Sequence, residues 1–540
     1  MLKVGRSGQQ LAAVTLVLTV VAAALYGPNA IHGGFLSDAW SNRAIYAFAP
    51  KPGFFAGITQ YMAQPNIAVR PLLAVYLSAL NAVFGGHMGV WLCWLIAANV
   101  AMCLSLYLLL RRLSLAAIDA AAISVLVLVF PVSGSLRFWA ALVASPTTIT
   151  FALVGFLLAL IAFESKDRRV SLALHGASLL LFAASLLLYE LMLPVMLLSV
   201  LIYRLRVPWR AAIFRWLVDC AVLLTLALTI TRSSDSGFKQ SGGGMIGHAG
   251  EIYDQARTLL ATAVLPFASA NWHILLLVAL IPATGAIVYR LLPSDKELRL
   301  ELRRWLTVMA AGAIVVVVAY ALFIPGMDYY VPLQPGMGNR VNAVPSIGWV
   351  LLLYGGARMI GALVFRGVPR ARRLAQAFAV LGCALLAIGW VKTLRAESHS
   401  YTNAFLEDER VLNATQSAIP RPSPEGTIWT FGQPVQIAPG IPIFGNTWDM
   451  TTAIQLRYDD PTLQSYVAYP GTLFNCLAQA VEPGGPYQEG ENPWNNALRS
   501  PYGRTYFIDT GSGHAVRIDT QAECRRAASS FVPSPELPTG

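Results

Sequence analysis

The sequence predicts an all-α polytopic membrane domain of about eleven transmembrane helices, followed by a soluble C-terminal domain that is α/β or mostly β. Hydrophobic residues make up 56% of the 540 residues and charged residues only 12%, a composition unsuited to a water-soluble surface. Apolar stretches of membrane-spanning length recur until about residue 394 and then stop. We therefore divide the chain into a membrane domain, 1–395, and a C-terminal domain, 396–540.

The predicted membrane helices are apolar stretches of about 17 to 25 residues, enough to cross a hydrocarbon core of about 30 Å. The first, 11–26, follows Lys3 and Arg6 as the apolar core of a signal peptide would. No convincing small-residue cleavage site precedes Gly27, so we expect this helix to be retained. The other predicted helices are 88–110, 114–131, 146–163, 171–189, 191–203, 214–231, 271–289, 305–325, 344–365 and 374–394.

Clusters of Lys and Arg recur at every second turn of the chain and predict its orientation, because cations near helix ends stay on the cytoplasmic side. The N-terminus is then cytoplasmic. The loops at 27–87, 132–145, 232–270 and 326–343 are extracytoplasmic, together with the C-terminal domain. The formal charge of +11 thus indicates membrane topology and not nucleic-acid binding. The clusters are Arg111 and Arg112; Lys166, Arg168 and Arg169; Arg204, Arg206, Arg210 and Arg215; Arg290, Lys296, Arg299, Arg303 and Arg304; and Arg366, Arg370, Arg372 and Arg373.

The C-terminal domain contains short β-type segments separated by Pro, Gly, Asn and Asp. "GTIWTF", 426–431, predicts a strand, and "RTYFIDTGSGHAVRID", 504–519, predicts a hairpin around a Thr-Gly-Ser-Gly turn. An oxidising compartment permits either a disulfide between Cys476 and Cys524 or two free thiols. The final segment, 533–540, is predicted to be disordered.

Aromatic residues of the C-terminal domain allow two interpretations. Their rings could stack on the apolar faces of sugars, or they could fill the core of a small domain. Neither periodicity nor spacing groups them on one face, so we favour the core. These residues are Trp429, Trp448, Tyr458, Tyr466, Tyr469 and Trp494.

The first outward loop, 27–87, contains two segments with helical patterns and is not a simple linker. "SDAWSNRAIYAF" predicts a short helix at the membrane interface, with Trp40 and Tyr46 at headgroup depth. "RPLLAVYLSALNAVFGG", 70–86, starts with a proline suited to a first helical turn and ends at two glycines, but a full crossing here would invert every later charge cluster. We therefore predict a juxtamembrane helix. Asp38 is the only carboxylate in the loop, and it is either a turn or cap residue or a functional group.

These features resemble the GT-C glycosyltransferases, bacterial integral-membrane enzymes that use polyprenyl-phosphate sugars. The resemblance rests on an aspartate just outside the first helix, an Arg-Pro-Leu that opens the second amphipathic segment, and a "NAVFGG" exit into a helix ending "YLLLRRL". "LLLYELMLPVML", 186–197, resembles the family's acidic helix end, and "GNRVNAVPSIGWVLLL", 338–353, resembles its arginine-led late helix. The similarity covers most of the predicted membrane domain.

The resemblance implies an inverting glycosyltransferase of the bacterial inner membrane, which moves a sugar from a polyprenyl-phosphate donor to an extracytoplasmic glycan, glycolipid or protein. It assigns the catalytic acidic residue to Asp38, which we predict to be the general base, with a pKa raised in a partly desolvated pocket. Many relatives carry paired acids in the first loop, but here Ala39 follows Asp38, and 131–146 contains no acid. We therefore favour an enzyme without a metal cofactor over one that uses a divalent metal.

Arginines near outward helix ends are candidates for binding the donor phosphate. Arg340 leads, because a guanidinium at an outer helix end can meet a phosphate with two hydrogen bonds. Arg70 and Arg137 are further candidates. Each of the three has the alternative of reaching ordinary lipid phosphates. The candidate substrate-binding residues are His87, Glu190, Asp328 and Tyr329.

Two other functions remain as alternatives: a transporter or flippase of lipid-linked saccharides, and a polysaccharide polymerase or ligase with a pyrophosphate-linked donor. Transporter folds usually carry internal repeats, and the sequence shows none to our reading. "SGGGMIGHAG", 241–250, resembles a phosphate-binding loop but lacks the Walker spacing. We predict a flexible or gating loop there.

Overall fold

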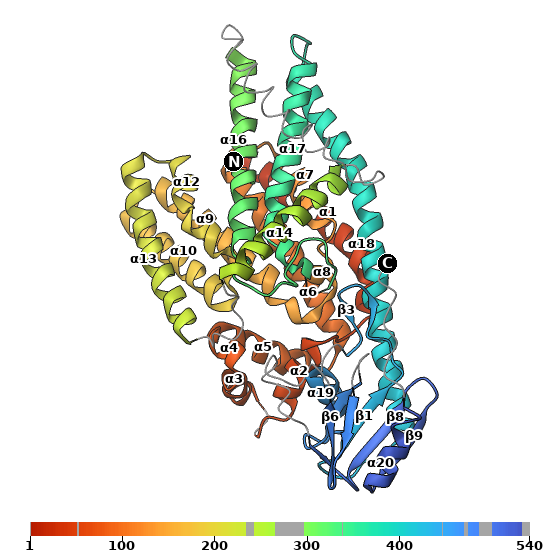
Figure 1. The fold of residues 1–540 in the computed structure, drawn as a ribbon. Coiled ribbons are helices and arrows are strands. Elements are labelled where there is room, and N and C mark those ends of the chain that lie inside the picture. Colours follow the sequence, from red (N-terminus) through yellow and green to blue (C-terminus); the bar gives the residue numbers. More distant parts are fainter. Residues whose placement is uncertain are drawn as a thin grey trace.

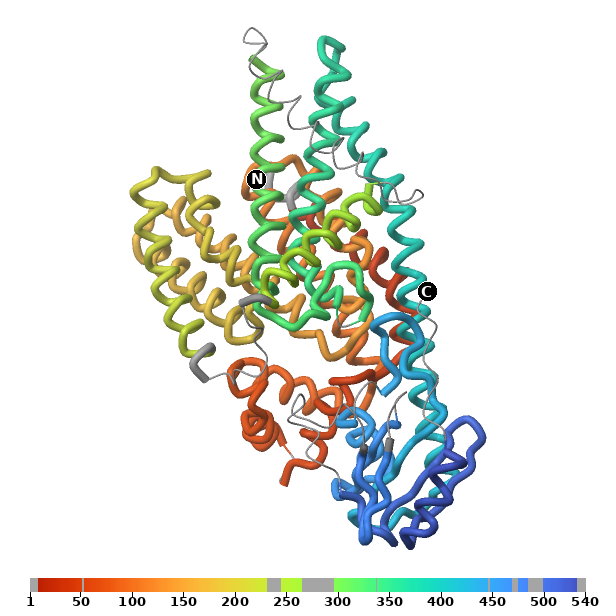
Figure 2. Tube along the Cα trace, in the orientation of Figure 1, coloured from red at the N-terminus to blue at the C-terminus, as the bar shows by residue number. Residues whose placement is uncertain are grey.

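The structure is a computed structural model that describes residues 2–50, 53–233, 242–264, 296–336, 338–444, 447–468, 473–484 and 499–531. Helices fill most of its length, and the strands gather at one end (Figures 1 and 2). Within these ranges, eight helices are long and apolar enough to cross a membrane. Each overlaps one of the predicted membrane helices. They are α1 (Leu2–His32), α6 (Met88–Arg112), α9 (Ala144–Glu164), α10 (Arg168–Leu188), α13 (Trp209–Ser233), α16 (Lys296–Ala321), α17 (Pro345–Val364) and α18 (Ala371–Ala418).

The predicted number of about eleven membrane helices is not confirmed. The segment 114–131 forms α7 (Ala117–Leu128), a buried helix of 12 residues. The segment 191–203 is broken into η2 (Glu190–Met192), α11 (Leu193–Leu197) and α12 (Ser199–Arg204), with Pro194 in the first turn of α11. Proline has no backbone N–H to continue a preceding helix. The segment 271–289 lies outside the described residues.

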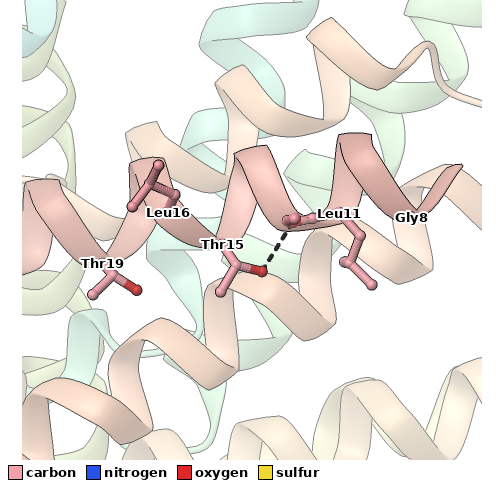
Figure 3. A pocket seen from close by; sticks show the side chains of 6 residues that line it. Gly8, Leu11, Thr15, Leu16 and Thr19 are labelled. Carbon is pink, nitrogen blue, oxygen red and sulfur yellow. Dashed lines mark hydrogen bonds between the residues drawn. The ribbon is translucent and has the colours of Figure 1, made fainter. Parts of the chain in front are cut away.

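Apolar side chains cover the outer faces of several long helices. Leu381, Leu385 and Ile388 of α18 follow helical spacing and are each more than 60% exposed. Figure 3 shows the outer face of α1, where the Thr15 hydroxyl donates to the Leu11 carbonyl of the same helix at 2.9 Å. That hydroxyl therefore needs no partner outside the helix. Such faces suit a lipid environment and not water.

Residues of three of the basic clusters come together around Ser114 at one end of the helices. Arg206 donates to the Arg112 carbonyl and, at 2.7 Å, to the Ser114 hydroxyl, and Arg304 donates to the Ser114 carbonyl. In Figure 1 the first turns of α16 and α18 lie at the top, while the short helices of the first loop and the strands lie at the bottom. The first loop and the strands thus lie at the end opposite these basic residues. Residues 242–264, from another loop predicted to be extracytoplasmic, lie instead among the long helices (Figure 1), where Trp390 of α18 donates to the Ala263 carbonyl at 2.9 Å.

Short helices occupy the loops near the strand-containing end. The two helices predicted in the first loop are confirmed as α2 and α5. Trp40 of α2, however, is only 4% exposed and donates to Asp408 of α18, so its predicted position at headgroup depth is wrong. Residues 242–250, predicted as a loop, begin the helix α14. The short elements are α2 (Asp38–Ala47), α3 (Phe54–Met62), α4 (Pro65–Ala68), α5 (Pro71–Phe84), α8 (Ser135–Phe138), η1 (Ala140–Leu142) and η4 (Gly338–Asn342), whereas α14 (Gly242–Val264) has 23 residues and lies among the long helices (Figure 1).

The C-terminal region is mixed α/β. Its main sheet has the order β4-β1-β8-β9, in which β1 runs parallel to β4 and β8. Trp429 of β1 pairs in register with Tyr466 on one side and Phe507 on the other. Strands β8 and β9 form the predicted hairpin. The elements are β1 (Thr427–Phe431), β2 (Gln436–Ala438), β3 (Ile441–Pro442), α19 (Thr447–Tyr458), β4 (Gln464–Val467), β5 (Leu473–Cys476), β6 (Ala480–Gly484), β7 (Ser500–Pro501), β8 (Thr505–Asp509), β9 (His514–Ile518) and α20 (Gln521–Ala527).

The sheet encloses an aromatic core. Trp429 is fully buried, Tyr466 is 9% exposed, and their ring centroids lie 4.3 Å apart. For these two rings the core interpretation is confirmed. Trp448 and Tyr458 are partly buried, and Tyr469 and Trp494 lie outside the described residues, as does the segment 533–540.

A disulfide joins Cys476 of β5 to Cys524 of α20, with their Cα atoms 5.8 Å apart. The two cysteines are 48 residues apart in the sequence. In the chain-entropy model, a loop of this length stabilises the folded state by about 4 kcal/mol.

Removal of this disulfide should selectively weaken the C-terminal region. We expect Cys476→Ser/Cys524→Ser to lower the temperature of the first thermal unfolding transition. Limited proteolysis of the C-terminal region monitors this transition. The direct measurement is mass spectrometry after denaturation and alkylation without reductant: the wild type should gain four labels, and six after reduction. Six labels without reductant would contradict the pairing.

Candidate functional site

The turn between α1 and α2, residues 33–37, places Asp38 at the first position of α2. Gly34 packs so closely on the Phe405 ring of α18 that a Cβ atom there would overlap the ring. Ser37 has a φ of 47°, a left-handed conformation that is uncommon outside glycine. The start of α2 is therefore set by close packing against α18.

Asp38 is partly exposed, and it does not cap α2. The cap position belongs to Ser37, and no donor within the described parts of the chain makes a hydrogen bond to the Asp38 carboxylate. Burial raises the pKa of Asp38 above its ordinary value, and the positive charge of Arg340 opposes this rise. Asp38 is therefore a carboxylate whose protonation depends on a nearby arginine.

Arg340 comes from η4, in the loop that leads into α17, and is 8% exposed. Its guanidinium lies 5.4 Å from the ring centroid of Trp139 and 5.0 Å from that of Tyr330. Both distances fall in the range of cation–π attraction. The charge also acts on Tyr189 and Asp38. The positive group is thus held among aromatic rings beside the carboxylate.

Arg70 and Glu190 form an ion pair next to this group. Arg70 Nε donates to Glu190 Oε2 at 2.8 Å, and a second bond joins Nη2 to Oε1. The Arg70 guanidinium also lies 4.6 Å from the ring centroid of Tyr189. Burial alone would raise the pKa of Glu190, but the charge and hydrogen bonds of Arg70 hold it below its ordinary value. Arg70 is therefore committed to a carboxylate partner.

These groups form one site, which we call the Asp38 cluster. The charge of Arg340 acts on Tyr189, Tyr329 and Tyr330, and that of Arg70 acts on Tyr189 and Tyr330, so the two arginines share a set of phenols. Five of the predicted site residues meet here, from segments far apart in sequence. The members of the Asp38 cluster are Asp38, Arg70, Trp139, Tyr189, Glu190, Tyr329, Tyr330 and Arg340.

Three predicted site residues do not join the Asp38 cluster through any contact that the structure describes. Arg137 is 2% exposed and donates to Asn99 and to the Val127 carbonyl, so its guanidinium is used inside the helix bundle. His87, at the cap of α6, and Asp328 are exposed.

Three members of the Asp38 cluster are not among the predicted site residues: Tyr189 and Tyr330, which are sequence neighbours of predicted residues, and Trp139. Trp139 lies only two residues after Arg137, which was selected because it is a cation in an outward loop. The only feature of the sequence that could have identified Trp139 is its position in that outward loop. The short helix α8 turns Arg137 inward and leaves Trp139 against Arg340.

The Asp38 cluster offers a carboxylate with a raised pKa next to a guanidinium, and a neutralised ion pair beside them. A carboxylate of this kind can accept a proton, and a guanidinium can bind a phosphate oxygen. In the described ranges, no three His, Cys, Asp or Glu side chains are grouped so that they could hold a metal ion. No protein-family model matches this chain, and no curated protein sequence matches it.

The Arg70–Glu190 pair predicts a non-additive pattern of stability. Arg70→Leu should destabilise the protein more than Arg70→Leu/Glu190→Leu does, because the single variant leaves a half-buried carboxylate without its partner. We expect a coupling free energy of about 1 to 3 kcal/mol from a double-mutant cycle of unfolding in mixed detergent. Strict additivity of the two single variants would contradict the pairing.

Proposed function

We propose that this chain is an inverting glycosyltransferase that moves a sugar from a polyprenyl-phosphate donor to a hydroxyl of an extracytoplasmic acceptor. The observation that carries the proposal is the electrostatic influence of Arg340, held between the Trp139 and Tyr330 rings, on the Asp38 carboxylate at the start of α2. The membrane-spanning helices would give a lipid-linked donor access from the bilayer. The proposal includes a bacterial inner membrane, a cytoplasmic N-terminus, and a glycan, glycolipid or protein as acceptor.

The proposed reaction is a single displacement. The acceptor oxygen attacks the anomeric carbon, the bond from that carbon to the phosphate oxygen breaks, and Asp38 takes the hydroxyl proton. The polyprenyl phosphate leaves with the bonding electron pair, and Arg340 stabilises its increased negative charge. Asp38 must be ionised to act as the base, and its position beside Arg340 favours that form.

The test is an assay of purified protein in nanodiscs with a panel of radiolabelled polyprenyl-phosphate sugars and glycan acceptors. Transfer of label to an acceptor supports the proposal. Transfer only from a pyrophosphate-linked oligosaccharide would instead assign a polymerase or ligase. Movement of an intact donor between leaflets without transfer would assign a flippase.

Asp38→Asn should lower kcat by about 10²-fold to 10⁴-fold, the usual contribution of a general base, without changing the unfolding temperature. Turnover of the labelled donor is the measurement. Glu164→Gln is the matched control, because Glu164 pairs with Arg112 at the other end of the helices and its loss should leave kcat unchanged. Near-normal turnover by Asp38→Asn would exclude the base role.

Arg340→Gln should move the acid limb of the rate profile to higher pH. The ionised base is the active form, so the rate falls as pH drops through the Asp38 pKa. Burial raises that pKa and Arg340 lowers it, so loss of Arg340 raises it further. The measurement is kcat/KM against pH, with Arg112→Gln as a distant control whose limb should not move. If the acid limb of Arg340→Gln stays at the wild-type pH, Arg340 does not influence the pKa of Asp38.

A further inference from the structure

Helix α18 carries four buried polar side chains on one face, and one of them, Thr415, bonds within the helix. Glu397, Tyr401 and Asp408 are 7%, 2% and 0% exposed. Their spacing places them within about 40° of one another around the helix axis. Buried polar groups on a long apolar helix need partners. Glu397 and Asp408 each have one hydrogen-bond partner in a segment that carries a charge of the Asp38 cluster. Glu397 also bonds to the Gly134 backbone, and Asp408 to the Phe444 backbone.

Glu397 is connected to the segment that carries Arg340. Its Oε1 accepts a hydrogen bond from Asn339 Nδ2 at 3.2 Å. Asn339 is fully buried, and its side-chain oxygen accepts from the Ser135 backbone N–H at 3.3 Å. Because Asn339 directly precedes Arg340 in η4, this bond fixes the turn from which the Arg340 guanidinium projects.

Asp408 is connected to the segment that carries Asp38. Its Oδ2 accepts a hydrogen bond from Trp40 Nε1 at 3.2 Å. Trp40 follows Asp38 by two residues in α2, and its ring lies edge-on to Phe35 with the centroids 5.7 Å apart. Rotation or sliding of α2 would break this bond, so the bond fixes the direction in which Asp38 points.

Tyr401, between the two, touches the turn that precedes Asp38. With Ser37, Trp139 and Gly336 it lines a cavity of about 10 Å³, which has room for about one water molecule and none for a sugar. The Ser37 and Tyr401 hydroxyls are buried there without a hydrogen-bond partner in the described chain. The middle of this face is thus packed tightly against the start of α2.

We propose that α18 sets the position of Asp38 relative to Arg340. Glu397, acting through Asn339, and Asp408, acting through Trp40, are positioning residues spaced about 17 Å apart on one rigid helix. Neither touches the proposed reacting atoms. The catalytic meaning of this arrangement rests on the proposed function, but the mechanical connection does not.

Hydrogen exchange measured by mass spectrometry on the full-length protein in nanodiscs tests the connection without any substrate. Glu397→Leu should speed exchange in 338–344 and leave 36–47 unchanged, and Asp408→Leu should do the reverse. Glu397→Gln and Asp408→Asn keep an accepting oxygen and should restore the wild-type pattern. Thr415→Val is the matched control, because the buried Thr415 hydroxyl bonds only within α18. It should change neither segment.

Enzyme kinetics then distinguish the role of Glu397 from that of Asp408. Glu397→Leu should raise KM for the polyprenyl-phosphate donor by about tenfold or more, and Asp408→Leu should lower kcat by a similar factor, because small displacements of catalytic groups are costly. Should a leucine variant fail to fold, Asn339→Leu or Trp40→Phe removes the same bond from the other side. Equal exchange changes in both segments, or none, would overturn the inference. Failure of every donor to react with the wild type would instead overturn the proposed function and leave the exchange result intact.

Discussion

The electrostatic influence of the buried Arg340 guanidinium on the Asp38 carboxylate constrains the elements around them. Neither Asp38 nor Arg340 could be buried alone without a large loss of hydration energy. The chain meets this constraint with rings on two sides of Arg340, contributed by Trp139 and Tyr330. The three loops that contribute Asp38, Trp139, and Tyr330 with Arg340 must therefore keep their relative positions, and movement of any one of them alters the electrostatic environment of Asp38.

The C-terminal region is part of the same packing unit. Ser41 of α2 and Thr452 of α19 lie within hydrogen-bond distance at 3.2 Å, and Ile441 of β3 is buried among residues of the membrane helices. Helix α18 runs without interruption through the boundary predicted at 395/396 and continues to Ala418. The change in composition near 396 marks where the apolar stretch ends. It does not mark an end of the helix or of the packing.

Most elements could be predicted because their determinants are local. Apolar length predicted about eleven membrane helices, eight of which match long apolar helices of the structure, and Pro71 with Gly85 predicted the limits of α5. The charge pattern places four of the site residues at outward helix ends, and their grouping could be predicted from this common placement. They are Asp38, Arg70, Glu190 and Arg340. The orientations of Trp40 and Arg137 could not be predicted. Amphipathic spacing shows which face of a helix is apolar, but not whether lipid or another helix covers it.

The charges of the Asp38 cluster change during the proposed reaction in a way that suits its leaving group. Arg70 and Arg340 carry two positive charges, and Glu190 and ionised Asp38 carry two negative charges, so the resting site is close to neutral. When Asp38 takes the proton of the acceptor, the site gains one net positive charge while the phosphate gains one negative charge. Because Glu190 pairs with Arg70, the loss of the Asp38 negative charge acts mainly on the surroundings of Arg340, where the proposed phosphate lies. If the Asp38 carboxylate stayed ionised, its negative charge would oppose the attraction between Arg340 and the phosphate. The proposed mechanism therefore places the base close to the phosphate site.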